Sequence, residues 1–433
     1  MATLQLNDKR TTNAWCMYDW ANSAYSLTIT TAVFPIYYEA VTEGPDKLGI
    51  VNFFGLEVVN TVLYSYALSF SFLVTALILP LLTGIADYGG KKKPFLKAFA
   101  YLGSLACASL FFFEGSNVEF GIAMAVLASI GYSGSLVFYD AYLPEIATED
   151  RFDKLSARGY SYGYVGSVIL LIFNLVMIME PGLFGLEDTA LTSKIAFVSV
   201  AVWWAGFSQI PFWRLPDDIH NRQVSGKYFT KGYQEIRKVY QSLKDLPNLK
   251  RFLLAYFFFN AGVQAVMYLA TLFGTKELNL GTTALIITVL IIQLVAIGGA
   301  YLFAQLSQRK GNIYSLSVMV VIWIGVCIAA YFVNSETQFY ALAFVVGLIM
   351  GGIQSLSRAT YSKLIPKNTI DTASYFSFYD VTFNLSLVMG TFAFGFVEQL
   401  TDSMRNSALA LGVLFIIGML LLRRVVIRPN QPA

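Results

Sequence analysis

The chain has 433 residues, of which 56% are hydrophobic and 13% charged, with a mean hydropathy of +0.59 and a formal net charge of +3. Soluble domains carry about 25% charged residues. The composition therefore excludes an ordinary soluble protein and predicts a multi-pass membrane protein whose partner is the lipid bilayer. We expect no nucleic-acid partner.

Cysteine and histidine usage excludes several kinds of site. Cys16, Cys107 and Cys327 lie far apart in apolar stretches, so the sequence shows neither a disulfide framework nor metal-ligand spacing. The only histidine, His220, lies in a polar loop, and no GxxxxGK[ST] phosphate-binding motif occurs. We expect no metal, no cofactor and no enzymatic activity, because a membrane-embedded enzyme needs a convergent set of catalytic groups.

Apolar runs that can cross a bilayer recur along the chain, since about twenty apolar residues span it as a helix. With a cytoplasmic N-terminus, only Lys47, Lys194, Lys276 and Arg405 face outward, and the other 26 of the 30 Lys and Arg residues face inward. This positive-inside bias predicts that both termini are cytoplasmic, and the compact loops suit a bacterial inner membrane. The twelve predicted spans are 15–38, 62–86, 95–113, 119–139, 160–179, 194–213, 251–273, 282–306, 313–333, 339–357, 374–397 and 406–423.

The longest inside loop divides the spans six and six. Within it, Phe229, Tyr233, Ile236, Tyr240 and Leu243 recur at helical spacing among basic residues. This pattern is typical of an amphipathic helix on an anionic leaflet, although a plain connector is the simpler interpretation. The predicted parts are an N-terminal six-helix half at 1–213, a cytoplasmic linker with an amphipathic helix at 214–250, and a C-terminal six-helix half at 251–433.

The first span contains the octapeptide Tyr18–Tyr25, YDWANSAY, which places Asp19 and Asn22 in an otherwise apolar helix. An acidic side chain at the centre of a lipid-facing helix costs roughly 2.5–3.5 kcal/mol. Asp19 therefore either has a function or stabilises its helix N-terminus through the macrodipole. The sequence leaves both interpretations open.

Short motifs recur between the predicted halves. Ser-x3-Tyr-x4-Pro occurs at 135–144 and again at 357–366, an offset of 222 residues, and Tyr-x3-Asn occurs at 18–22 and 256–260. Two six-helix halves in parallel repeat are the arrangement of major facilitator transporters. The expected fold class is therefore an all-α membrane protein with 12 transmembrane helices in two pseudo-symmetric six-helix halves.

The loop after the second span resembles the signature of the major facilitator superfamily, Gly-x-Leu-Ala-Asp-Arg-x-Gly-Arg-Arg, through 85–87 and 90–92, with departures at Thr83 and Tyr88. In the superfamily this acid caps a facing helix and holds one conformation, so the resemblance implies a gate. An ordinary positively charged inside loop is the alternative. The predicted gating residues are Asp87, Lys91, Lys92 and Asp140.

Three further segments, 18–25, 138–147 and 351–366, resemble signatures of the vacuolar-effluxer-like branch of that superfamily. Its members are relatives of the autophagy-linked amino-acid effluxer of fungal vacuoles. Many members carry Asn-Asp-Gly-Val in the seventh span, where this chain has Ala261 in place of the acid. The resemblance implies efflux of amino acids or similar metabolites.

Polar residues inside several spans share one helix face, at spacings of three and four residues. Such faces can line a water-filled cavity between the halves. For a single residue the alternative is an interhelical hydrogen bond, which contributes about 0.6 kcal/mol on average. Gly347 and Gly351 are expected to serve close helix packing. The predicted substrate-binding residues are Asn22, Ser23, Ser26, Asn260, Gln264, Gln354 and Asn384.

Three ionisable residues within the spans are candidates for coupling transport to an ion gradient. Asp380 lies about two turns from the inner end of its span, and Arg358 is placed to pair with Asp380 or Asp371 or to bind a substrate carboxylate. Because a buried carboxyl can take up and release a proton, the proton is the candidate coupling ion. The predicted coupling residues are Asp19, Asp380 and Arg358.

These observations predict a secondary active transporter that moves a small polar solute across the membrane by alternating access. The alternative is a membrane receptor or scaffold that keeps the transporter fold and moves nothing. Two features keep that alternative open: the missing acid at Ala261, and the segment 304–311, which aligns with the signature loop after the second span but lacks most of its residues.

Overall fold

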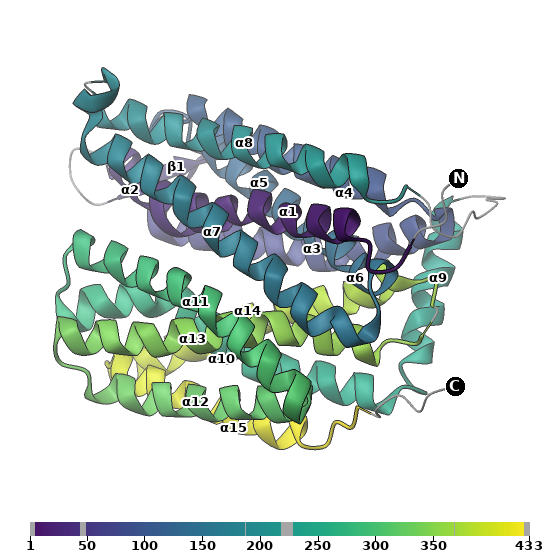
Figure 1. The fold of residues 1–433 in the computed structure, drawn as a ribbon. Coiled ribbons are helices and arrows are strands. Elements are labelled where there is room, and N and C mark those ends of the chain that lie inside the picture. The colour runs from purple at the N-terminus through teal and green to yellow at the C-terminus, as the bar shows by residue number, and fades with distance from the viewer. Residues whose placement is uncertain (1–4, 44–48, 187, 218–227, 368, 428–433) are drawn as a thin grey trace.

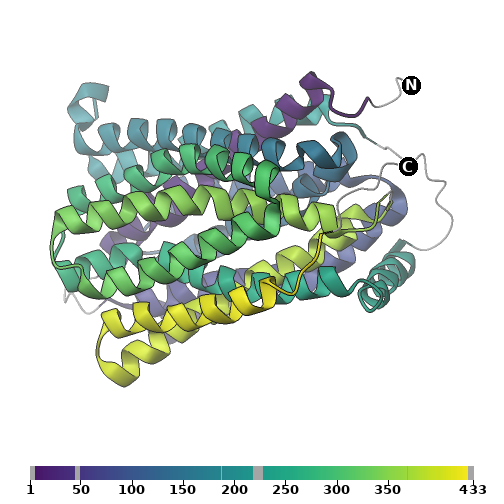
Figure 2. The same ribbon diagram turned by 60° about the horizontal axis from the view of Figure 1, so that its bottom comes forward.

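Two groups of helices make up the molecule. The computed structural model describes residues 5–43, 49–186, 188–217, 228–367 and 369–427 and is almost entirely helical. Helices α1–α8 form what we call the N-terminal group and α10–α15 the C-terminal group (Figure 1). Helix α9, the start of α1 and the chain after α15 lie at one end of the bundle, the α9 end (Figures 1 and 2). The opposite end carries a β-hairpin, and we call it the hairpin end.

The elements follow one another along the chain with these bounds: α1 (Lys9–Ala24), a π-helical segment (Tyr25–Val33), α2 (Phe34–Thr42), β1 (Ile50–Phe53), β2 (Leu56–Val59), α3 (Asn60–Gly89), α4 (Lys92–Ser109), a 3₁₀ turn (Leu110–Phe112), α5 (Val118–Asp140), α6 (Leu143–Ile146), a 3₁₀ turn (Glu149–Arg151), α7 (Phe152–Met179), a 3₁₀ turn (Pro181–Phe184), α8 (Thr189–Arg214), α9 (Tyr228–Ser242), α10 (Pro247–Leu278), α11 (Thr282–Lys310), α12 (Asn312–Phe332), α13 (Glu336–Leu364), α14 (Thr372–Thr401) and α15 (Met404–Leu422).

The twelve predicted spans correspond to helical segments in the structure. Within the described residues, 11 helices are long and apolar enough to cross a bilayer. The first span differs, because α1, the π-helical segment and α2 follow one another without interruption. The N–H of Phe34 bonds to the carbonyl of Ile29, five residues earlier, and Pro35, which has no N–H, follows at once. Such widened turns occur frequently at functional sites, and the sequence analysis did not predict this one.

Close helix contacts rely on glycine where backbones meet. A Cβ added at Gly351 of α13 would overlap the carbonyl oxygen of Ala296 in α11, and one at Gly347 would overlap that of Ile292. The predicted packing role of these two glycines is confirmed. Between the two groups, α7 packs on α11 and α13, and α3 packs on α14.

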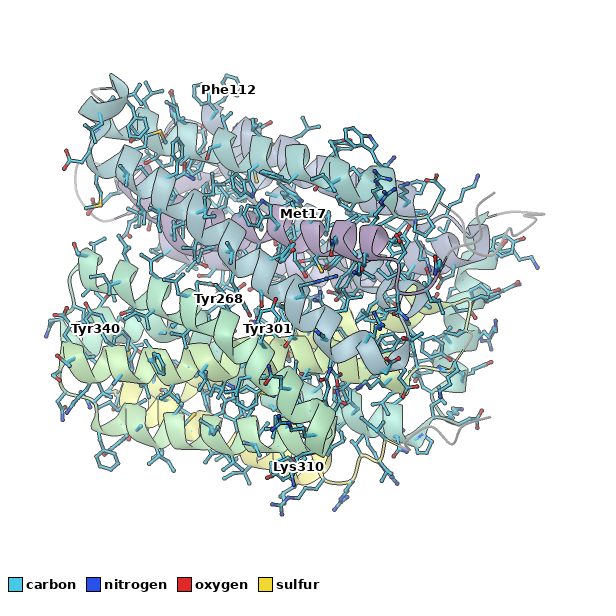
Figure 3. All side chains as sticks on the ribbon, in the orientation of Figure 1. Met17, Phe112, Tyr268, Tyr301, Lys310 and Tyr340 are labelled. Atoms are coloured by element: carbon cyan, nitrogen blue, oxygen red, sulfur yellow. The ribbon has the colours of Figure 1, made fainter. Side chains whose placement is uncertain are left out.

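Side chains fill the space between the two groups, and Tyr268 and Tyr301 lie there (Figure 3). Both tyrosines come from the C-terminal group, on α10 and α11. The interface therefore contains phenol groups as well as apolar side chains.

A short antiparallel hairpin connects α2 to α3, and the sequence analysis missed it. Strand β1 pairs with β2 so that Ile50 lies opposite Val59 and Phe53 opposite Leu56. Phe54 and Gly55 both have positive φ, 50° and 85°, which is the geometry of the two-residue turns that match strand twist. The strands have four residues each, which is too short to give a recognisable strand pattern among longer apolar runs.

The predicted linker helix is present as α9, and one of its faces packs on the bundle. It runs across the ends of the other helices (Figure 1) and packs against α3. A Cβ added at Gly84 of α3 would overlap the carbonyl oxygen of Gly232, and one at Gly232 would overlap Ile85, so neither position has room for a Cβ. His220 and the side chain of Phe229 lie outside the described residues. The predicted division at 1–213, 214–250 and 251–433 assigns α9 to the linker, and we keep it as a proposal below.

Replacing Gly351 with alanine is expected to lower the melting temperature of the purified protein, because overpacking a tight contact costs about 1–3 kcal/mol. Gly298→Ala is the matched control, since a Cβ at Gly298 meets nothing within 4 Å. Thermal unfolding in detergent, followed by intrinsic fluorescence, compares the two variants. Equal melting temperatures would contradict the packing argument.

Candidate functional site

Arg358 of α13 is a buried cation that binds carboxylates of the other group. Its Nη1 donates to Oδ1 of Asp140 in α5 at 2.9 Å, and its Nη2 donates to Oδ2 of Asp19 in α1 at 3.2 Å. Its Nε and Nη2 also donate to the hydroxyl and carbonyl oxygens of Ser156 in α7, at 2.8 and 3.1 Å. We call these four residues the arginine cluster. One side chain, 1% exposed, thus joins the C-terminal group to three helices of the N-terminal group.

Aromatic rings surround this cluster. The guanidinium carbon of Arg358 lies 4.7, 5.5 and 4.3 Å from the ring centroids of Trp15, Tyr139 and Tyr160. The hydroxyl of Tyr139 donates to Asp19 at 2.7 Å, and the indole N–H of Trp15 donates to the carbonyl of Tyr139 at 3.0 Å. Guanidinium groups stack favourably on such rings, and the rings exclude water, which strengthens the ion pairs.

Two interpretations of the sequence are corrected here. The N-cap of α1 is Asp8, whose carboxylate accepts from the N–H of Thr11 at 2.8 Å, and that hydrogen bond lowers the pKa of Asp8. Asp19 lies well inside the same helix, so the capping interpretation of Asp19 is wrong. Arg358 pairs with Asp19 and Asp140, and not with Asp380 or Asp371, because α13 packs against α7 of the other group.

Asp87, near the end of α3, caps the first turn of α14. Its carboxylate accepts from the N–H groups of Ala373 and Ser374 at 3.3 and 2.6 Å. The first N–H groups of a helix have no partner within it, and the helix dipole favours a negative charge there. This buried carboxylate therefore has the contact that the superfamily signature implied, with a facing helix of the other group.

Lys92, the first residue of α4, adds a second contact between the N-terminal group and the start of α14. It forms an ion pair with Glu145, and its Nζ donates to the hydroxyl of Thr372, the first residue of α14, at 2.6 Å. That hydroxyl lies 2.6 Å from Glu145 as well. Lys91, in contrast, is exposed. The sequence analysis did not find this pairing of Lys92 with Glu145.

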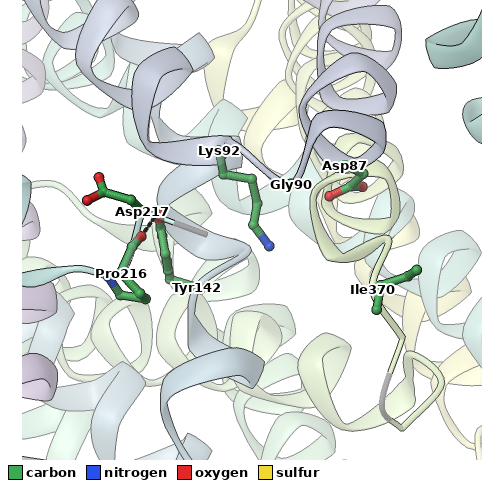
Figure 4. Close-up of a pocket in the computed structure, with 7 residues that line it drawn as sticks. All are labelled: Asp87, Gly90, Lys92, Tyr142, Pro216, Asp217 and Ile370. Carbon is green, nitrogen blue, oxygen red and sulfur yellow. Dashed lines mark hydrogen bonds between the residues drawn. The ribbon is translucent and has the colours of Figure 1, made fainter. Parts of the chain in front are cut away.

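A small pocket opens beside these residues (Figure 4). Tyr142 closes one side by donating its hydroxyl to the carbonyl of Pro216 at 2.9 Å. The residues that line the pocket are Asp87, Gly90, Lys92, Tyr142, Pro216, Asp217 and Ile370.

A third set of contacts, the Asp153 cluster, was not predicted. Asp153, in the first turn of α7, accepts from Ser307 of α11 at 2.9 Å, from Asn312 of α12 at 2.8 Å and from Lys363 of α13 at 2.7 Å. Lys363 also donates to Asn312 at 2.7 Å. The available signal was the repeat, because the segment 304–311 at the end of α11 aligns with the segment at the end of α3 that carries Asp87.

Several predicted substrate-binding residues bond within the C-terminal group. The amide of Asn260 in α10 donates to Ser386 of α14 at 2.5 Å, and Gln264 donates to Asn260 at 3.2 Å. Asn384 donates to Asp380 at 2.9 Å along α14. Asn260 thus makes the interhelical hydrogen bond that was the alternative to a cavity-lining role.

Other predicted binding residues lie nearer the interface between the groups. Gln354 accepts from the hydroxyl of Tyr164 in α7 at 2.7 Å, which joins the two groups directly. Asn22 is buried, and its amide nitrogen makes no hydrogen bond within the described residues. Ser23 and Ser26 are half-buried. These four residues offer amide and hydroxyl groups on α1, on the π-helical segment that follows it and on α13, the helix that carries Arg358.

Asp380 differs from the other buried acids. It is 9% exposed, and within the described residues no lysine or arginine lies within 4 Å of its carboxylate. The carboxylate of Asp140 acts on it electrostatically. No cation holds this buried carboxyl in its charged form, so it is suited to take up and release a proton.

The chemistry of the site is therefore ionic and hydrogen-bonding. Among the described residues, no three His, Cys, Asp or Glu side chains come together as a metal site. The arginine, Asp87–Lys92 and Asp153 sets all bridge the two groups.

The fold defines the class of protein. A structure of FucP in the outward conformation matches with a TM-score of 0.71 and 13% identity, over 96% of this chain and 97% of that one. The chain thus has the twelve-helix fold of the major facilitator superfamily, and it is a multi-pass integral membrane protein.

The particular family follows from the sequence comparisons. Residues 7–430 match the family described as vacuole effluxer Atg22 like, and the chain belongs to it. An uncharacterized MFS-type transporter, YxiO of Bacillus subtilis, is 32% identical over 415 residues, 95% of this chain and 93% of the relative. Autophagy-related protein 22 of Yarrowia lipolytica is 23% identical over 463 aligned positions, 86% of this chain and 77% of the relative.

Arg358→Gln is expected to destabilise the protein by about 3–5 kcal/mol, because it leaves two buried carboxylates without their cation. The triple variant Arg358→Gln, Asp19→Asn, Asp140→Asn removes all three charges and is expected to recover most of the loss. Chemical or thermal unfolding in detergent measures both.

The control for this series is Arg405→Gln, which breaks a more exposed pair with Glu277 at the hairpin end and should cost no more than about 1 kcal/mol. A triple variant as unstable as Arg358→Gln alone would contradict the ionic account of the cluster.

Proposed function

We propose that the chain is a secondary active transporter that moves a small polar solute by alternating access between its N-terminal and C-terminal groups. The arginine cluster is the observation that carries this proposal. A buried ion set that spans two groups of helices favours discrete arrangements, joined or separated, over a continuous range. In this proposal the halves are 1–213 and 251–433, and 214–250 links them.

The proposed orientation has the α9 end and both termini in the cytoplasm. The positive-inside rule supports it, since Lys91, Lys92, Lys93 and the basic residues of α9 lie at that end. A bacterial cell membrane is the proposed location, and the Bacillus subtilis relative supports it. With this orientation the contacts of Arg358 and Asp87 close the cytoplasmic side, and the similarity to FucP in the outward conformation agrees with that state.

Asp87, Lys92 and Asp140 are proposed to act as gating residues, because each joins the two groups at the α9 end. Opening that end would require each of these contacts to separate. Lys91 is exposed, and we propose that it contributes only to the positive charge of the loop.

The proposed solute site lies between the two groups, next to the arginine cluster. The half-buried Ser23, Ser26 and Gln354 would be accessible to a solute there, and the amide nitrogen of Asn22 has no hydrogen-bond partner within the described residues. Asn260, Gln264 and Asn384 would join them only if their hydrogen bonds within the C-terminal group exchange for bonds to the solute. Amide and hydroxyl groups suit the charged ends of an amino acid, and the family's description as effluxers supports amino-acid efflux.

We assign proton coupling to Asp380. In this proposal the ion pair of Asp19 and Arg358 responds to the protonation of Asp380 through Asp140. A potential of 100 mV contributes about 2.3 kcal/mol for each charge that crosses the membrane. That is sufficient to drive a substantial solute gradient.

In proteoliposomes with an imposed pH gradient, the wild-type protein is expected to move a radiolabelled amino acid, and Asp380→Asn is expected to lose the gradient-driven flux. Exchange of solute without a pH gradient should persist in Asp380→Asn, because a permanently neutral residue still permits the conformational change. Asp402→Asn is the matched control, since Asp402 is an exposed residue at the other end of α14 with φ of 49°, a conformation that asparagine tolerates.

Two outcomes would contradict this assignment. Gradient-driven flux by Asp380→Asn equal to that of the wild type would remove Asp380 as the coupling residue. Absence of flux and of exchange for every amino acid and related metabolite tried would favour the receptor or scaffold.

A further inference from the structure

Helix α9 is positioned to act on the contact between α3 and α14. It crosses the ends of the bundle (Figure 1) and lies at the same end in Figure 2. One face lies on α3, where Gly232 meets Gly84 and Val239 is buried. Helix α9 also contacts α14. It therefore touches both of the helices that Asp87 joins.

Polar contacts attach α9 to the start of α14. The ammonium of Lys238 lies 2.9 Å from Asp371, and the hydroxyls of Ser242 and Tyr375 lie 2.8 Å apart. The hydrogen bond to Asp371 raises the pKa of Lys238. A raised lysine pKa means that the pair contributes fully at neutral pH and is lost only in strongly alkaline solution.

A second face of α9 is exposed and carries alternating aromatic and basic side chains. Tyr233 and Tyr240 are 60% and 62% exposed. Arg237 lies between them and is exposed, as is Lys244 in the turn after the helix. The spacing of four, three and four residues places these side chains on one side of a helix. We call them the Tyr-Arg stripe.

The stripe borders the lipid-facing surface of the bundle. The ring of Tyr240 lies 6.2 Å from that of Phe378 in α14. Two turns farther along α14, Leu385 is exposed, and so is Phe392 beyond it. An apolar surface on a membrane helix is suited to acyl chains, and Tyr240 lies at the end of this surface that is nearest to α9.

We propose that the Tyr-Arg stripe binds the headgroups of anionic phospholipids and that this binding holds α9 across the α3–α14 contact. Tyrosine is favoured where one side of the ring is apolar and the other wet. Basic side chains near an anionic leaflet strengthen the attraction about fivefold each, the equivalent of about 1 kcal/mol. Charge complementarity therefore selects an anionic bilayer surface over a zwitterionic one. The proposal does not depend on whether the chain transports a solute.

The experiment is hydrogen–deuterium exchange on the full chain in lipid nanodiscs made of phosphatidylcholine, with and without phosphatidylglycerol. Backbone amides at 231–242 of the wild type are expected to exchange about fivefold more slowly when phosphatidylglycerol is present. Amides at the start of α14 are expected to slow with them, because Lys238 and Ser242 connect the two helices.

The test variant is Arg237→Gln, Lys244→Gln, which should lose the dependence on phosphatidylglycerol. Arg423→Gln, Arg424→Gln is the matched control, because it removes two exposed positive charges at the same end from the chain after α15, and it should keep the dependence. Melting temperatures near that of the wild type verify that both variants are folded.

Three outcomes would overturn the proposal. The first is exchange in α9 that does not respond to phosphatidylglycerol in the wild type, the behaviour of a plain connector. The second is a response that survives in the Arg237, Lys244 variant. The third is a response lost equally in the Arg423, Arg424 control, which would reflect net charge and not the stripe.

Discussion

The buried guanidinium of Arg358 is the constraint on which the closed α9 end depends. A cation within a bilayer is tolerated only when protein groups replace its water, and here the two carboxylates come from the opposite group, on Asp19 and Asp140. The C-terminal group therefore cannot move away from the N-terminal group at this end without exposing three charges. In the proposed alternating access, separation would coincide with entry of water or of a charged solute.

The contacts of Asp87 and Asp153 between the groups are alike, except that the acid lies on a different helix of the contacting pair. Asp87 lies at the end of α3 and reaches the start of α14. Asp153 lies at the start of α7 and receives side chains from the end of α11 and the start of α12. The pairs α3–α14 and α11–α7 are equivalent under the internal repeat. In the first pair the acid, Asp87, lies at the end of α3. In the second pair the acid, Asp153, lies on the partner helix, at the start of α7. Together with Arg358, these two contacts resist separation of the groups at the α9 end.

The sequence predicted whatever depends on local composition or on a short motif. Apolar runs specified the twelve spans, and the loop signature identified Asp87 as a capping acid for a facing helix. Partners distant in sequence were beyond it, since Arg358 and Asp19 are 339 residues apart and nothing local distinguishes Asp19 or Asp140 from Asp380 as the acid that Arg358 binds. The partner of Asn260 was hidden for the same reason, because Ser386 is an ordinary serine until α10 and α14 pack. The hairpin and the π-helical segment were missed because each is short and lies next to or within a span that was otherwise predicted correctly.

Distances between spin labels, measured by pulsed electron resonance, test the central claim most directly. One pair at the α9 end, Asp150→Cys with Lys310→Cys, and one pair near the hairpin end, Leu183→Cys with Thr283→Cys, each cross between the groups at exposed positions. In wild-type background we predict a short α9-end distance as the main population. In Arg358→Gln background the α9-end distance should lengthen while the hairpin-end distance shortens. Distances that stay the same in both backgrounds would contradict the account, because Arg358 would then not hold the two groups together.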